Sequence, residues 1–357
     1  MRVDRLPLLA LSIGLLLAAL WAGLIRLGWA WPPLVAPLPM AHGPLMVGGF
    51  LGTVIGLERA IALGRRWGYA APLFAGLGAL LTALGIVPWG PLTLTLGSLG
   101  LAATTIVVVR IHPATHTVVL ALAAATWLAG NLLWLFGQMI PQVVVWWIGF
   151  LVLTIAGERL ELSRFLRPPA WVRWTFVAVV AVMLAGMVLA AVTYPLGMRV
   201  SGLGWLLLAA WLLRVDIARR RVRAGGQARF MALALLAGYF WLGAAGIMAL
   251  IYGGIMAGPR YDALLHSVFL GFVLSMIFAH ALIIFPVVLG AALPYHPRFY
   301  VHLGLLHATL VLRVVSDLLP WWPGRLWGGT LNVIVVLLFL ANTVTSLRPR
   351  PSLPNQP

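Results

Sequence analysis

Twelve apolar runs, each of about 20 residues or more, divide this chain of 357 residues and constrain its fold more than any other feature. A helix needs about 20 apolar residues to cross the roughly 30 Å hydrocarbon core of a bilayer. Hydrophobic residues make up 62% of the chain and charged residues only 9%, too few to cover a water-exposed particle of this size. The sequence therefore predicts an all-α polytopic membrane protein with about twelve transmembrane helices. The runs cover residues 6–31, 37–63, 69–88, 90–111, 116–138, 141–161, 173–195, 197–218, 228–255, 260–288, 299–319 and 325–346.

The 24 basic residues are all arginines, and their positions predict the orientation of the chain. If the N-terminus is inside, 19 arginines fall on the inner side, four lie at outer ends, and Arg313 alone lies deep within a run. This asymmetry follows the positive-inside rule. We therefore expect a multi-pass protein of a bacterial-type cytoplasmic (inner) membrane, with both termini cytoplasmic. Arginines placed in this way face membrane lipid rather than nucleic acid.

The predicted domain organisation is a single transmembrane domain, residues 1–346, followed by a Pro-rich, polar and disordered cytoplasmic tail, residues 347–357. Within the domain, Glu58-Arg59 ends the second run and Glu158-Arg159 ends the sixth, 100 residues apart. The tenth run carries His280 at the corresponding depth. This pattern predicts three parallel four-helix units, residues 1–113, 114–225 and 226–357, around a pseudo-threefold axis. Alternatively, each Glu-Arg pair marks a helix end whose side chains reach the headgroups.

Two histidines are expected at similar depth in the outer half of the bilayer. His42 lies near the outer end of the second run and His266 near the outer end of the tenth, and both runs enter from outside. Two neutral imidazoles at one level on separate helices are what a six-coordinate haem iron needs as axial ligands. We therefore predict that His42 and His266 are metal ligands to a haem, of the b type.

Other residues near this level are candidates for the same cofactor site. Gly48, Gly52 and Gly56 form a stripe without side chains, which lets either another helix or a flat macrocycle approach closely. Arg313 either binds the haem propionates or forms a structural ion pair, for which Asp317, four residues later, is a candidate partner.

A second, inner site is a weaker hypothesis. Because the chain has no cysteine, any metal there must be held by His, Asp, Glu or Met. The candidate ligands, with copper as the metal, are His280, His302, His307, Glu58 and Glu158. The alternative is that these side chains simply reach the headgroup region.

The run from Met40 to Met46 (Met-Ala-His-Gly-Pro-Leu-Met), the twelve spans and the histidine of the tenth span resemble the catalytic subunit of haem–copper oxidases. They resemble still more the related NnrS-type membrane proteins, which are associated with the nitric oxide response. The resemblance implies that His42 and His266 are the two ligands of a low-spin haem. The family's reductases also need histidines on spans 6 and 7 and a second histidine on span 10, and these are missing here. We therefore predict no oxygen or nitric oxide reductase activity.

The first functional hypothesis is thus a haem-binding inner-membrane protein that serves electron transfer, with a redox partner or quinol, or a nitric-oxide-related response. The alternative is a transporter or channel with an inner vestibule lined by Glu58, Glu158 and His280. A third hypothesis is a scaffold subunit of a respiratory complex.

Overall fold

The computed structural model describes residues 5–163 and 169–348, which form helices and contain no β-strand. Within these ranges, eleven helices are long and apolar enough to cross a membrane. Nine of them are single α-helices: α1 (Leu6–Leu27), α5 (Trp89–Ile111), α6 (Thr115–Leu135), α7 (Ile140–Ser163), α8 (Ala170–Val192), α9 (Tyr194–Val215), α11 (Gly226–Tyr252), α14 (Phe299–Leu318) and α15 (Trp322–Ser346). The predicted all-α membrane fold is confirmed.

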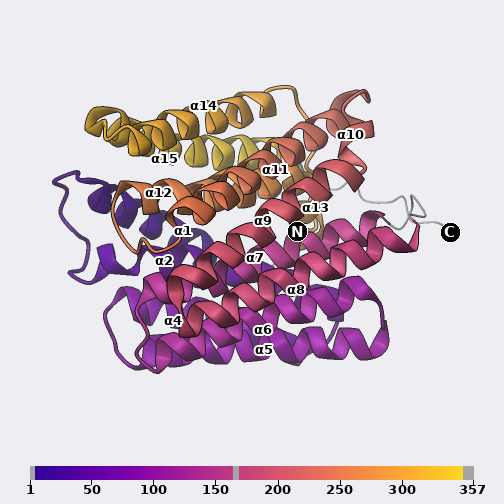
Figure 1. Cartoon of the computed structure of the whole chain (residues 1–357), viewed down its shortest axis with the longest axis horizontal. Coiled ribbons are helices and arrows are strands. Elements are labelled where there is room, and N and C mark those ends of the chain that lie inside the picture. Colours follow the sequence, from indigo (N-terminus) through magenta and orange to yellow (C-terminus); the bar gives the residue numbers. More distant parts are fainter. Residues whose placement is uncertain (1–4, 164–168, 349–357) are drawn as a thin grey trace.

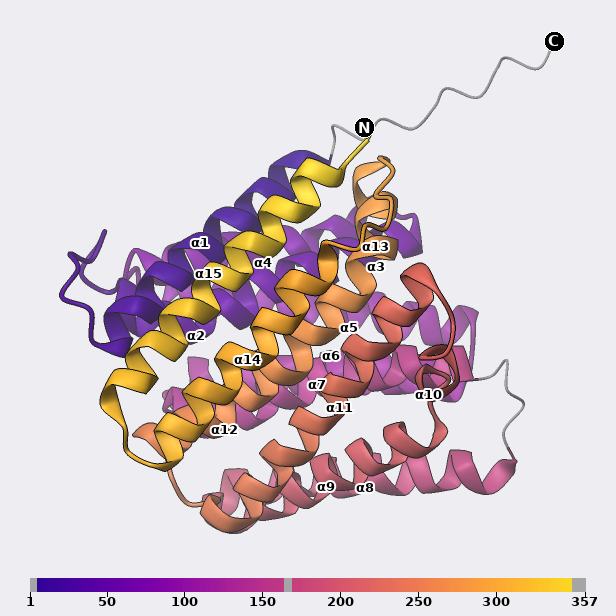
Figure 2. The same cartoon turned by 90° about the horizontal axis from the view of Figure 1, so that it is seen from above.

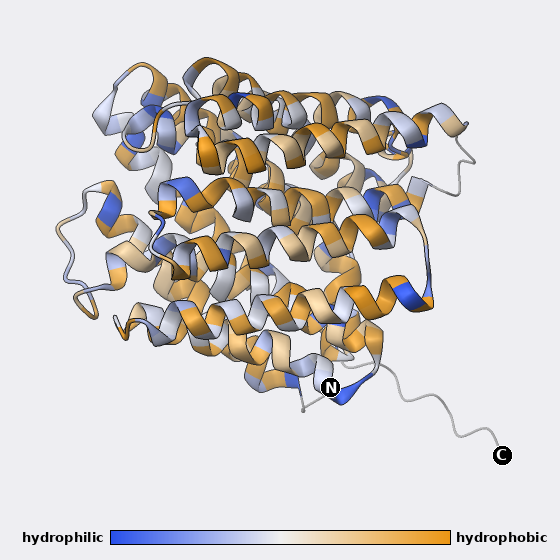
Figure 3. Ribbon diagram, turned by 60° about the horizontal axis from the view of Figure 1, so that its bottom comes forward, coloured by the Kyte–Doolittle hydropathy of each residue, from blue (hydrophilic) through white to orange (hydrophobic). Residues whose placement is uncertain are grey.

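The helices run side by side as one bundle (Figure 1). In the view from above, α1 begins and α15 ends at the same end of the bundle (Figure 2). Hydrophilic residues gather toward the helix ends and loops, and the helix shafts are mainly hydrophobic (Figure 3). This distribution is the one expected for a bundle whose middle is surrounded by hydrocarbon.

The third predicted run is shorter than expected. It forms the 3-10 helix η4 (Arg66–Tyr69) and then α4 (Ala70–Ala83), which has 14 residues. At 1.5 Å per residue α4 is about 21 Å long, less than the hydrocarbon thickness. The helix stops before Gly85, whose φ of 73° lies in the left-handed region. Because η4 (4 residues) continues directly into α4 (14 residues), the third predicted run is helical over residues 66–83, a shorter, composite segment packed against α5 and α1.

Two spans are composite and carry a π-helix. The second span runs through η2 (Leu38–Ala41), α2 (His42–Pro44), the π-helix η3 (Leu45–Gly52) and α3 (Thr53–Leu63). The tenth runs through α12 (Pro259–His266), the π-helix η6 (Ser267–Leu274) and α13 (Ser275–Leu289). Each π-helix begins within three residues after a candidate histidine. π-helical turns inside α-helices occur frequently at functional sites.

The second, sixth and tenth spans form the centre of the bundle. Buried residues make up 61% of the most apolar stretch in the second and tenth spans and 78% in α7, against at most 56% in the other candidate spans of the described chain. α13 packs against α3, and α7 packs against η6. The second, sixth and tenth spans are each the second span of a predicted four-helix unit, and a threefold repeat would require all three to be buried alike. The repeat itself stays a prediction.

The chain end bears on the predicted tail. Arg348 forms an isolated antiparallel bridge with Ala292, through main-chain hydrogen bonds of 2.9 Å in both directions. The first two residues of the predicted tail are therefore described next to the loop that follows α13. Residues 349–357 of that prediction lie outside the described residues.

A short helix completes the described elements. α10 (Ala218–Arg221) follows α9 and contacts α11. Asp216, one of the few acidic residues of the chain, lies between the end of α9 and the start of α10.

Candidate functional site

A cavity of about 330 Å³ lies between the first, second, tenth and last spans, with α7 and α14 also contributing to its wall. Both His42 and His266 line it, although they come from spans more than 200 residues apart in sequence. The volume lies at the lower end of the range for small-molecule and cofactor sites. Most of the wall is apolar, including Leu20, Val47, Phe50, Leu270, Val333 and Val336.

The His42 ring is fixed by the first helix. Its Nδ1 lies 2.8 Å from the main-chain oxygen of Ala19 on α1. Gly23, one turn further along α1, makes room for the ring, because a Cβ there would lie 2.9 Å from His42 Cε1. A carbonyl oxygen only accepts, so Nδ1 carries the hydrogen and the neutral ring keeps its lone pair on Nε2. Metal-bound histidines are held in this way.

The His266 ring is fixed within its own helix. Its Nδ1 donates to the main-chain oxygen of Asp262, at 2.9 Å, and lies 3.3 Å from Oδ1 of the Asp262 carboxylate. The neutral ring again has its lone pair on Nε2. The two candidate ligands thus share one tautomer, but only His266 has a carboxylate beside it.

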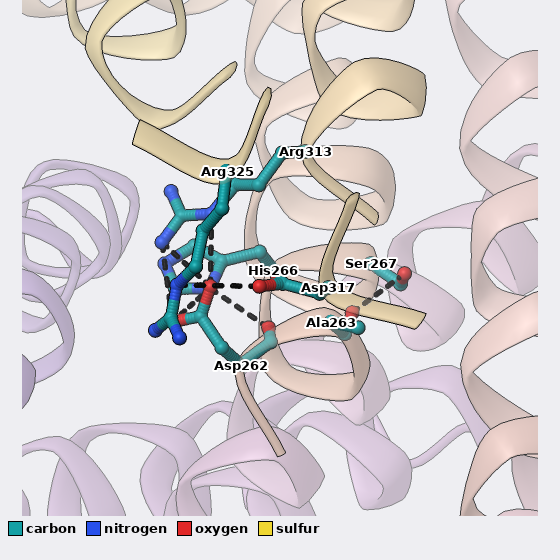
Figure 4. Close-up of polar contacts among 7 residues, drawn as sticks. All are labelled: Asp262, Ala263, His266, Ser267, Arg313, Asp317 and Arg325. Carbon is teal, nitrogen blue, oxygen red and sulfur yellow. Dashed lines mark hydrogen bonds and ion pairs between the residues drawn. The ribbon is translucent and has the colours of Figure 1, made fainter. Parts of the chain in front are cut away.

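Asp262 connects His266 to a charged cluster at the polar part of the cavity (Figure 4). Arg313 on α14 donates to both carboxylate oxygens of Asp262, from Nε at 2.9 Å and from Nη2 at 3.1 Å. Arg325 on α15 lies 3.9 Å from Asp262 and 3.2 Å from Asp317. Arg313 thus forms the structural ion pair considered for it, but its partner is Asp262 on α12 and not the candidate Asp317, which lies beside Arg325.

The charge that lines the cavity is positive overall. Arg26, Arg313 and Arg325 all line it, whereas Asp262 is the acidic residue in its wall. Such a wall suits an amphipathic ligand with an apolar body and anionic groups.

The glycine stripe does not reach this cavity. Gly48, Gly52 and Gly56 pack against α5, α6 and α4 respectively, and none of the three lines the cavity. A Cβ on Gly52 would lie 2.6 Å from the ring of Trp127. The stripe therefore serves close helix packing, which was the alternative considered for it, and gives no support to macrocycle binding.

The inner histidines are not brought together as a metal site. His302 lies against Phe278 and Phe339 and is 3.1 Å from Asn342 Nδ2. His307 accepts a hydrogen bond of 3.1 Å from Trp241 Nε1. Among residues 5–163 and 169–348, no group of three or more His, Asp and Glu side chains is arranged to hold a metal ion. The structure thus gives no support to a copper site.

A second pocket, of about 580 Å³, opens near the turn between α5 and α6. It is lined by Arg59, His112, His116 and Glu161 among others. Glu58, Glu158 and His280, which the transporter hypothesis placed around a vestibule, do not line it. The two pockets have no lining residue in common.

Sequence reasoning missed two participants in the cavity. Asp262 lies four residues before His266, so one helical turn of spacing was the available signal for their contact. Arg325 is one of the four arginines expected at outer helix ends, and the positive-inside pattern gives it no further role. Nothing in the sequence singles out the Ala19 carbonyl, because every residue carries one.

Comparison with known proteins places the whole domain in one family. The chain belongs to the family described as a domain of unknown function (DUF8744), which matches residues 5–348. No curated protein matches the chain. The cavity and the second pocket both lie within the matched residues, and the family description assigns neither of them a role.

Proposed function

For this member of the DUF8744 family, we propose that the cavity binds haem, of the b type, between His42 and His266, and that the protein transfers electrons in the cytoplasmic membrane. One observation carries the proposal: two imidazoles from separate spans line one mainly apolar cavity, and each has its Nδ1 bound to a main-chain carbonyl. When bound, haem supplies reversible one-electron chemistry at its iron.

The residues of the chain have distinct tasks in this proposal. The carbonyls of Ala19 and Asp262 hold both rings with Nε2 free to coordinate. The apolar wall excludes water and favours a flat hydrophobic ligand. Arg26, Arg313 and Arg325 provide positive charge for the two propionates, with Arg313 also held in place by Asp262.

Electron transfer is preferred to gas binding because His42 and His266 would both hold the haem and would leave no place for a gas ligand. A nitric-oxide-related response therefore rests on the resemblance to NnrS-type proteins alone. A redox partner or quinol is part of the proposal, since transfer needs a donor and an acceptor. Transport has less support, because the three residues suggested for the vestibule line neither of the two pockets described above.

The test is the visible spectrum of purified protein reconstituted with haem. Wild type is expected to show a Soret band typical of bound low-spin haem. His42→Ala and His266→Ala should each abolish this low-spin signal, because each removes one axial ligand. His116→Ala is the matched control, since His116 is buried but lies in the other pocket. An unshifted free-haem spectrum in wild type, or a low-spin signal that survives both ligand substitutions, contradicts the proposal.

A further inference from the structure

The three central spans meet at a charged cluster away from the histidine cavity. Two carboxylates there share one arginine: Arg59 Nη2 contacts Glu58 at 3.4 Å and also binds Glu158 Oε1 on α7. The side chains of Glu58 and Glu158 are only 26% and 23% exposed. One guanidinium offsets one carboxylate, so this group carries a surplus negative charge if both glutamates are ionised.

The arginine that follows Glu158 in sequence is already paired with another carboxylate. Arg159, the residue after Glu158, binds Asp216 through two hydrogen bonds of 2.7 and 2.8 Å. Both partners are almost fully buried, with side chains 3% and 2% exposed. Asp216 also accepts hydrogen bonds from the Tyr239 hydroxyl and the Ala218 main-chain N–H. Arg159 and Asp216 therefore form a closed, neutral pair, and the surplus charge stays with the glutamates.

His280 adds an unused acceptor beside them. Its Nδ1 lies 2.7 Å from the Met276 main-chain oxygen, so the lone pair of the neutral ring is on Nε2. That Nε2 is buried and has no hydrogen-bond partner among the described residues. His280 lies on α13, which packs against α3, and it is close enough to Glu58 for their charges to interact. A buried acceptor without a donor is costly.

We propose that Glu58 and Glu158 together bind one exchangeable proton. A proton on this pair removes the surplus charge, and the O–H of a protonated Glu58 provides a donor toward the free His280 lone pair. The proton comes from water, which reaches the cluster through the 580 Å³ pocket, because Arg59 lines that pocket and also binds both glutamates. The cluster is thus a proton-binding site at the junction of the three central spans, and it does not depend on haem.

The charged and titratable groups on the elements packed around the pair come from several helices. They are Arg59 on α3, Arg66 and Tyr69 on η4, Arg110 on α5, Arg159 and Glu161 on α7, His280 on α13, Tyr239 on α11, Asp216 at the end of α9, and His112 and His116 at the turn between α5 and α6.

Infrared difference spectroscopy tests the proposal, because the C=O stretch of a protonated carboxyl is separate from that of a carboxylate. Purified wild type at neutral pH should show such a band, shifted in D₂O, that disappears at alkaline pH and is separate from the contribution of the buried Asp262–Asp317 carboxyl pair in the other cluster. E58Q and E158Q should each lose the whole band, since the remaining glutamate then pairs alone with Arg59 and stays ionised. Having two variants keeps the test valid if one of them fails to fold.

D317N is the matched control, because Asp317 is a buried carboxyl on α14 that belongs to the cluster around Asp262 and not to the glutamate pair. The control should keep the band at wild-type intensity. The proposal is overturned if folded wild type lacks a pH-dependent carboxyl band, or if the band persists in both E58Q and E158Q.

Discussion

The Arg159–Asp216 pair gives the sharpest stability prediction, because it is the most completely buried ion pair among the described residues. The substitution is Asp216→Asn, which keeps the size of the side chain and removes its charge. Asp216 now accepts four hydrogen bonds, two from Arg159 and one each from Tyr239 and Ala218. The amide nitrogen of asparagine brings donors toward the Arg159 donors, so the guanidinium is left buried without a counter-charge.

The expected loss of unfolding free energy is about 3–5 kcal/mol, the usual cost of leaving one member of a buried pair uncompensated. Breaking an exposed ion pair lowers the free energy of unfolding by only about 0–1 kcal/mol. Because whole proteins are stable by only about 5–15 kcal/mol, the larger value removes a considerable part of the total. The pair joins α7 to the end of α9, so we expect local loosening there before global unfolding.

The assay is reversible unfolding in mixed micelles with increasing denaturing detergent, followed by circular dichroism. Glu161→Gln on the same helix is the control and should stay within about 1 kcal/mol of wild type. A double-mutant cycle with Arg159→Met should give a coupling of about 1–3 kcal/mol, because removing the orphaned charge recovers part of the loss. A loss below about 1 kcal/mol for Asp216→Asn, or additive single effects, would refute the reasoning.

Three further predictions concern the cavity and its surroundings. Gly23→Ala places a Cβ 2.9 Å from the His42 ring and should weaken haem binding about tenfold in a haem titration. Gly14→Ala on the same helix is the control, because a Cβ there has nothing within 4 Å, and it should leave the titration unchanged. Gly52→Ala should lower unfolding free energy by about 1–3 kcal/mol through overpacking, yet leave the haem spectrum unchanged, because the stripe lies outside the cavity. Asp262→Asn should raise the haem midpoint potential in a redox titration, since removing the carboxylate beside His266 makes that ligand less electron-donating; an unchanged or lower potential would count against its role.

Hydropathy and the Pro, Gly and Arg residues between the apolar runs predicted the crossing helices well, because both signals are local in sequence. The run 299–319, for example, became α14 (Phe299–Leu318), and 141–161 became α7 (Ile140–Ser163). For the run 69–88 the predicted end is too late, because composition does not show that Gly85 takes a left-handed conformation just after α4 ends at Ala83. The two π-helices were also out of reach, since their hydrogen-bond pattern depends on packing rather than on residue type.

For the candidate site, the sequence was informative where only the expected depth of a residue in the bilayer mattered. His42 and His266 were expected at one level of the bilayer, and they do line one cavity. It failed where rotation about the helix axis decided, as for the glycine stripe, which faces neighbouring helices instead of the cavity. It also misassigned Asp317, because i, i+4 spacing shows only that a contact is allowed, and Arg313 found a better partner on another helix.

The two proposed sites share the tenth span, which carries His266 at one site and His280 at the other, so the strength of their electrostatic coupling matters. His266 and His280 are separated by 14 residues, about 20 Å at 1.5 Å per residue. At an effective dielectric constant of about 20, unit charges at that distance interact by about 0.8 kcal/mol, roughly a fourfold change in an equilibrium constant. A negative charge added in the cavity between His42 and His266 would thus favour proton uptake at the glutamates only modestly. Strong linkage between the two events would therefore require movement of the shared helix, and the π-helix η6 lies between the two histidines.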